Sequence, residues 1–184
     1  MGILTKLYRL AELENEALTH YKATISSDHA YIHKGIAFTF AGNTGSLAAG
    51  ATYALSFTTP LTKTIHLRPT GFYSTANAME LRISEGATVT GGSAGTPWNR
   101  HRGINIPTKV LIGYGVTLSA EGTIIDYEYA GSQGAGANRN GGTGVPADEE
   151  IVLKPSTIYS IRIENIGATT ASTGYYKLFW YEED

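Results

Sequence analysis

The stretch Ile158-Tyr159-Ser160-Ile161-Arg162-Ile163-Glu164 decides the fold class, because its later side chains alternate between apolar and charged. Successive side chains of a strand point to opposite faces, so Ile161 and Ile163 share one face and the charged residues that follow them share the other. Met79-Glu80-Leu81-Arg82-Ile83-Ser84-Glu85 alternates in the same way. Both segments therefore predict strands with one face on a core and one face in solvent.

Period-two segments recur along most of the chain. We expect strands at Tyr21–Ile25, His29–His33, Ile36–Phe40, Tyr53–Thr58, Thr64–Arg68, Met79–Ser84, Val110–Leu118, Thr123–Tyr129, Glu150–Leu153, Ile158–Ile163 and Tyr175–Tyr181. Clusters of Gly, Thr, Asn and Pro separate them, and 22 of the 184 residues are glycine. Short strands with such turns and no helices between them are typical of antiparallel sheets that close into a sandwich or barrel. The predicted β domain covers residues 21–184.

Residues 1–20 have a different period. Ile3, Leu4, Leu7 and Leu10 recur at the spacing of one helical face, which predicts a short N-terminal amphipathic helical arm. Such an arm either packs on the β domain or reaches a neighbouring subunit.

Composition excludes several classes of function. Fourteen Lys and Arg against sixteen Asp and Glu leave a net charge of -2, which is not the balance of a nucleic-acid-binding protein. The absence of cysteine excludes disulfides, thiolate metal sites and a cysteine nucleophile. We find no apolar run of membrane-spanning length and no signal-peptide pattern, so we expect an intracellularly made protein without a membrane partner.

Residue patterns that carry chemistry are weak. Gly134–Arg139 is not a phosphate-binding loop, because no helical pattern follows it. His29 and His33 are four apart, but their surroundings predict a strand, on which that spacing does not form a metal site. Asp126 with Glu128, or Glu80 with Glu85, could form a glycosidase-like carboxylate pair, although alternation at 125–129 fits the solvated face of a sheet better. We expect no catalytic residues, no cofactor and no metal.

Charge distribution is more informative than these motifs. No acid lies between Asp28 and Glu80, between Glu85 and Glu121, or between Glu128 and Asp148, although these intervals carry Lys and Arg. The long glycine-rich segments Gly86–Pro107 and Gly131–Pro146 lie in two of them, and segments this long tend to be functional. The simplest alternative is that loops happen to lack acids. The functional interpretation is a mildly basic loop end that docks on an acidic surface.

Six segments that follow one another along the chain form a recognisable order: Ala51–Pro60, Ile65–Pro69, Glu80–Gly92, Thr96–Arg102, Val152–Tyr159 and Phe179–Glu182. This order resembles that of the small proteins that decorate or cement the heads of tailed bacteriophages. In that family the central loop ends in Asn-Arg-Asn-Arg, whereas this chain has Asn99-Arg100-His101-Arg102. The N-terminal arm is not part of the family pattern.

The resemblance implies an antiparallel, jelly-roll-like β-sandwich that binds the outer surface of a capsid without doing chemistry. The partner would be the major capsid protein, with self-association into a dimer or trimer, and the location the virion exterior after synthesis in the host cytoplasm. The candidate interface residues are Ile3, Leu4, Leu7, Leu10, Trp98, Asn99, Arg100, Arg102 and Arg139. One alternative is a host-attachment or carbohydrate-binding sandwich that uses Trp98, if this side chain does not fold back onto the core. A glycan-cleaving enzyme is a third.

Overall fold

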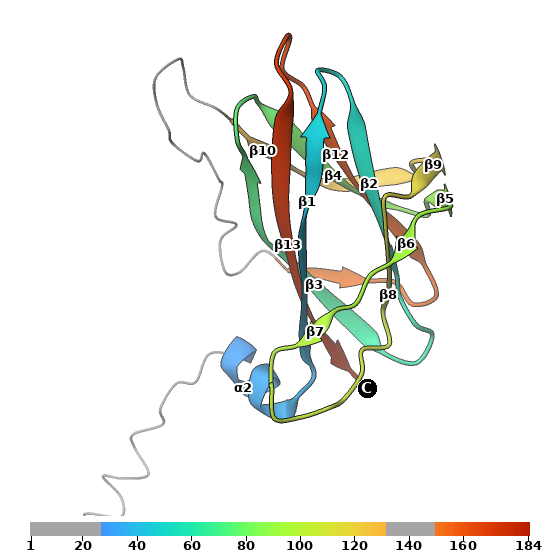
Figure 1. The fold of residues 1–184 in the computed structure, drawn as a ribbon. Helices are drawn as coiled ribbons and strands as arrows, with labels where there is room; N and C mark the ends of the chain where they lie inside the picture. The colour runs from blue at the N-terminus through green and yellow to red at the C-terminus, as the bar shows by residue number, and fades with distance from the viewer. Residues whose placement is uncertain (1–26, 132–149) are drawn as a thin grey trace, which may run out of the picture. The chain divides into compact units, whose positions relative to one another are not determined.

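The computed structural model describes residues 27–131 and 150–184 (Figure 1). The chain divides into a unit of residues 1–30 and a unit of residues 31–184, and the β-structure belongs to the second. The predicted arm at residues 1–20, with Ile3, Leu4, Leu7 and Leu10, lies outside the described residues. So do the predicted strand at 21–25, Arg139 and most of the glycine-rich segment around it.

Two antiparallel sheets face each other as a sandwich, which confirms the all-β prediction. Sheet A has the order β11 (Ile151–Leu153), β3 (Thr64–Ser74), β13 (Ser172–Glu183), β1 (Ala37–Leu47) and β7 (Trp98–Asn99). Sheet B has the order β10 (Thr123–Ala130), β4 (Met79–Glu85), β12 (Ile158–Asn165), β2 (Thr52–Thr58), β8 (Leu111–Tyr114) and β6 (Ser93–Ala94). A two-stranded sheet adds β5 (Thr88–Thr90) and β9 (Thr117–Ala120).

Side chains from both sheets fill the core between them. Trp180 of β13 is fully buried, and its ring lies 5.9 Å from that of Phe38 and 5.2 Å from that of Phe57, measured between centroids. Ile161 and Ile163 are fully buried as the alternation predicts, while Arg162 is partly exposed. Burying each large apolar side chain contributes about 1.5–3 kcal/mol, so this layer supplies the main driving force for folding.

The strand predicted at His29–His33 is wrong, because helix α2 (Ser27–Lys34) occupies these residues. Gly35 ends the helix with a left-handed φ of 72°, and its N–H donates to Ile32 O at 2.9 Å. Ile36 N–H donates to Tyr31 O at 3.2 Å. This pair of bonds is the Schellman arrangement, which glycine favours because it has no Cβ to strain in the left-handed region.

The structure also corrects the predicted loop at Gly86–Pro107 and the predicted strand at Val110–Leu118. Gly86–Pro107 is not a bare loop, since it contains β5, β6 and β7, of which β6 extends sheet B and β7 extends sheet A. The single strand predicted at Val110–Leu118 is two strands in different sheets, divided at Gly115, whose φ is 63°. Strands of two to four residues are too short to show a clear alternation, and their partners are distant in sequence.

The face assigned to Asp126 and Glu128 is also wrong. These carboxylates pair in register with Ile83 and Leu81, so they share the inward face of sheet B, and Tyr127 and Tyr129 take the solvated face. Burial raises the pKa of Asp126, against a backbone hydrogen bond from Tyr127 that lowers it. Within residues 27–131 and 150–184, no helix has the length and apolarity needed to cross a membrane.

Candidate functional site

The segment after β7 is held against the end of the sandwich by the side chain of Asn99. The Asn99 amide donates to Gly35 O at 2.7 Å and to Ile106 O at 3.1 Å, and Asn99 Oδ1 accepts from His101 N at 2.8 Å. The Asn99 side chain therefore ties the segment to the residue that ends α2, and it also joins the two ends of the 99–106 loop. Asn99, predicted as an interface residue, positions the loop.

The far end of this segment is fixed by a buried carboxylate. Glu182 is 4% exposed and accepts from the Thr108 hydroxyl, from Lys109 N at 3.0 Å and from Trp180 Nε1 at 3.2 Å. Because its donors come from both the loop and the core, Glu182 joins residues 99–109 to the centre of the sandwich.

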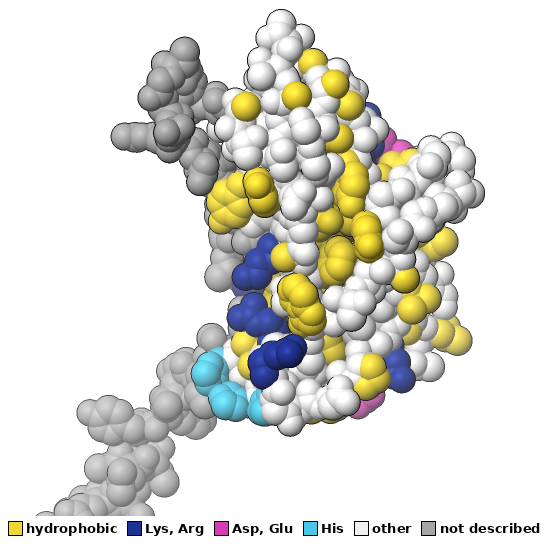
Figure 2. Space-filling model, in the orientation of Figure 1, with side chains coloured by type: hydrophobic (Ala, Val, Ile, Leu, Met, Phe, Trp, Pro, Cys, Tyr) yellow, Lys and Arg dark blue, Asp and Glu magenta, His cyan; other side chains and the backbone are white. Residues whose placement is uncertain are grey.

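Cations gather at this end of the molecule. We call the exposed side chains of Lys34, Arg100, Arg102 and Lys109 the basic loop end. The Arg100 guanidinium lies 5.5 Å from the Phe179 ring centroid, and Lys34 Nζ lies 5.6 Å from that of Tyr31. Figure 2 shows Lys and Arg side chains grouped on the lower part of this face, with acidic side chains only at its margins. Cations from two of the three acid-free intervals of the sequence thus meet in space.

Trp98 lies above the basic loop end, between two hollows on the outer face of sheet A. Its side chain is 54% exposed, so it does not cap the core. The first hollow, of about 300 Å³, is lined by Trp98, Thr39, Asn99, Arg100 and Arg102. The second, of about 390 Å³, is lined by Trp98, Tyr73, Tyr175 and Lys177 and by small residues of β1 and β3. Among the described residues lining the two hollows, none is acidic.

Three stacked aromatic rings lie on the outer face of sheet A, near the end where helix α2 packs. The Tyr181 ring lies between Tyr31 at 3.9 Å and His66 at 4.4 Å. Glu150 accepts from the Tyr181 hydroxyl at 2.6 Å and contacts His66 Nδ1 at 2.7 Å. Burial raises the pKa of Glu150, but the hydrogen bonds from Tyr181 and His66 outweigh it and hold that pKa below its usual value. Burial and the bond to Glu150 raise the pKa of Tyr181.

The other carboxylates considered for catalysis are tied to cations. Glu80 pairs with Arg82 on the next outward position of β4. Glu85 Oε1 lies 2.6 Å from Lys154 Nζ, and this contact holds the pKa of Glu85 below its usual value.

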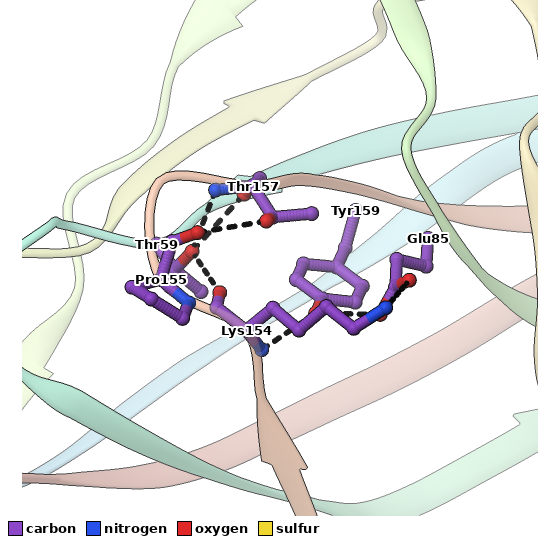
Figure 3. A network of polar contacts seen from close by, with 6 residues as sticks. All are labelled: Thr59, Glu85, Lys154, Pro155, Thr157 and Tyr159. Atoms are coloured by element: carbon purple, nitrogen blue, oxygen red, sulfur yellow. Dashed lines mark hydrogen bonds and ion pairs between the residues drawn. The ribbon is translucent and has the colours of Figure 1, made fainter.

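Figure 3 shows the network around Glu85 at the 154–159 turn. Tyr159 donates to Glu85 Oε2 at 3.1 Å and accepts from Lys154 N at 2.8 Å. Thr59 Oγ1 donates to Lys154 O at 2.6 Å and accepts from Thr157 N at 3.0 Å. These bonds lock the turn against β2, so Glu85 has a structural role there.

Histidines do not form a metal site in the described structure. His29 and His33 lie on a helix after all, and the His33 ring is 6.3 Å from that of His101 in an edge-on arrangement. Across residues 27–131 and 150–184, no three His, Asp or Glu side chains are grouped so that they could hold a metal ion.

Of the predicted interface residues that the structure describes, Trp98, Asn99, Arg100 and Arg102 lie together beside β1. Tyr73, Tyr175 and Lys177, which complete the second hollow, were not predicted from the sequence. Their grouping follows from the register of β3, β13 and β1, which are distant in sequence, so no local pattern could identify it. Comparison with known protein families, curated proteins and solved structures found no match to this chain.

Proposed function

We propose that this chain is a structural virion protein that decorates the outer surface of a tailed-phage capsid and stabilises contacts between major capsid protein subunits. The observation that carries the proposal is the basic loop end. Three of its four exposed cations lie on the segment that Asn99 and Glu182 fix at its two ends, and the fourth, Lys34, lies at the end of helix α2 to which Asn99 ties that segment. A fixed segment loses little conformational entropy when it binds, and its charges orient it on an acidic surface.

Docking through the basic loop end would attach the sandwich to the shell by one end, with the two sheets extending away from the shell surface. Arg100 and Arg102 would meet carboxylates of capsid subunits, and the outer face of sheet A above them would stay in solvent. Each copy that spans a seam between subunits adds its binding free energy to the cost of separating them. Repetition over the shell multiplies this effect, and self-association into a dimer or trimer would add avidity.

The strand order supports a jelly-roll-like winding as part of the proposal. Without the short additions β7, β8 and β6, the sheets read β11-β3-β13-β1 and β10-β4-β12-β2. Chain-adjacent strands β1 and β2, β3 and β4, and β10 and β11 thus alternate between the two sheets, as do β12 and β13. Eight strands wound in this way form the double-sheet architecture found in viral capsid and lectin domains. Fold alone does not assign function, so the docking surface remains the main argument.

Cosedimentation with bare capsid shells tests the proposal. The shells come from the phage whose genome encodes this chain. The variant Arg100→Glu/Arg102→Glu should lose most binding, and binding of the unaltered protein should weaken as salt rises, because exposed charges are screened. Lys177→Glu is the matched control, since it reverses a charge on the same sheet outside the basic loop end. Equal binding by the double variant and the control would refute docking through this surface.

The predicted arm at residues 1–20 enters the same assay as a separate variant. Deletion of residues 1–19 should reduce binding to shells more than it lowers the melting temperature, if Ile3, Leu4, Leu7 and Leu10 bind a neighbouring subunit. A large fall in melting temperature with shell binding intact would show that the segment belongs to the β domain.

A further inference from the structure

The second hollow beside Trp98 has small residues on its floor, on both sides of Lys177. Ala41 of β1 and Gly71 of β3 flank Lys177 of β13 in the strand register. Gly42 also lines the floor. A Cβ on Gly71 would come within 3.0 Å of Tyr73 Cε2, so the tyrosine ring lies over this glycine. Small residues at these positions leave about 390 Å³ of open space on the outer face of sheet A.

Aromatic rings form the walls of this hollow. Tyr73 and Tyr175 are direct cross-strand partners, and their side chains are 44% and 48% exposed. Trp98 closes the side nearest the basic loop end. Half-exposed rings with hydroxyl or indole N–H groups combine an apolar face with hydrogen-bonding edges, as a sugar ring requires of a binding surface.

Charge and backbone pairing narrow the ligand class. Lys177 supplies a cation in the hollow, Arg100 and Arg102 lie beyond Trp98, and none of the described lining residues is acidic. β13 is hydrogen-bonded to β3 on one side and β1 on the other, so the floor offers no free strand edge to an extended peptide. These features favour a ligand that stacks on the rings and carries a negative charge for Lys177.

We propose that the hollow bounded by Tyr73, Trp98, Tyr175 and Lys177 binds a saccharide that carries a carboxylate, with a pyranose ring on the aromatic walls and the carboxylate at Lys177. The volume of the hollow lies within the range of small-ligand sites. The inference goes beyond capsid docking and does not depend on it, since Tyr73, Tyr175 and Lys177 lie outside the basic loop end.

Titration with short oligomers of galacturonate, glucuronate and sialate tests this proposal, with tryptophan fluorescence and NMR shifts as readouts. At least one acidic oligomer should bind, and it should bind roughly tenfold or more tightly than its methyl ester, because a charge-assisted contact is lost in the ester. Hexaglutamate should not compete. Failure of all three oligomers, equal affinity for acid and ester, or displacement by hexaglutamate would overturn the proposal, the last in favour of an acidic peptide.

Two variants place the site without disturbing the fold. Ala41→Ile fills the floor from an exposed strand position, so binding should fall at least about tenfold while the melting temperature holds, since isoleucine favours strands. Tyr175→Ala should reduce binding similarly. The matched control Tyr127→Ala removes a tyrosine that is 60% exposed on sheet B and should leave binding unchanged. Unaltered saccharide binding by Ala41→Ile would contradict the assignment. Arg100→Glu/Arg102→Glu separates the two functions, because it should remove most shell binding, while Lys177 and the aromatic walls still hold the saccharide with a smaller loss of affinity than Ala41→Ile causes.

Discussion

Glu182→Gln should destabilise the protein and loosen the basic loop end together. Glu182 is 4% exposed and accepts from Thr108, Lys109 and Trp180. All three donors contact Oε1, and Lys109 N is shared with Oε2 at 3.0 Å. With its oxygen at the Oε1 position, the replacement amide offers these donors a neutral acceptor and turns its NH₂ toward Lys109 N. A hydrogen bond to a charged group contributes about 1.5–3 kcal/mol and a neutral one about 0.5–1.5 kcal/mol, so each of the three bonds is weakened.

We therefore expect the free energy of unfolding to fall by about 2–4 kcal/mol. For a chain of this size, that corresponds to a melting temperature lowered by roughly 5–15 °C. Thermal and urea unfolding at neutral pH measure the loss, and hydrogen exchange of residues 99–109 measures the loosening. Exchange should be faster throughout this segment in the variant.

Glu183→Gln is the matched control for this prediction. Glu183 is the next residue in the chain, but its side chain is 39% exposed and its contact with His66 Nε2 is 3.4 Å long. A surface pair of this kind contributes less than about 1 kcal/mol. Equal destabilisation by the two variants, or unchanged exchange in residues 99–109 of Glu182→Gln, would refute the claim that the buried carboxylate fixes the loop.

Three further predictions concern stability. Gly35→Ala should cost about 1–2 kcal/mol in unfolding experiments, because alanine is strained at φ 72° and its Cβ would meet Ile104 at 2.9 Å; an unchanged midpoint would contradict this. Tyr159→Phe should cost about 1–3 kcal/mol, since Lys154 N loses its acceptor, and it fails as a prediction if the variant is as stable as the parent. The lowered pKa of Glu150 stabilises the fold above its unfolded-state value of 4.5, and this contribution is lost as pH falls through the lower folded-state pKa. Melting temperatures of the parent and of Glu150→Gln should therefore differ most above pH 4.5 and converge as pH falls below it, and a gap that stays constant would contradict the assignment.

The alternation of the sequence was sufficient to predict the long strands of the sandwich. Ile161 and Ile163 are buried because the period of two places them on the core face, and the same rule located β4 and β12. The strand predicted at His29–His33 was wrong because it relied on local β propensity and ignored the helix-ending signal of Gly35. That glycine provides the helix stop, whose bonds to Tyr31 and Ile32 appear only in the structure.

The candidate site could be predicted only in part. Arg100 and Arg102 were identified because acids are missing from their stretch of sequence, which is a local property. Tyr73, Tyr175 and Lys177 meet because β13 pairs with β3 across a register shift next to Lys177. Such pairing joins residues about 100 positions apart, and it depends on packing of the whole sandwich rather than on nearby residues.

A cryo-electron microscopy reconstruction of the phage whose genome encodes this chain tests the central claim most directly. The account predicts sandwich-shaped density on the outer surface of the shell, upright, with residues 99–109 of the basic loop end against the capsid subunits and the Tyr73 and Tyr175 face in solvent. Particles whose heads lack this density, or heads on which the contact is made by another surface of the sandwich, would contradict it.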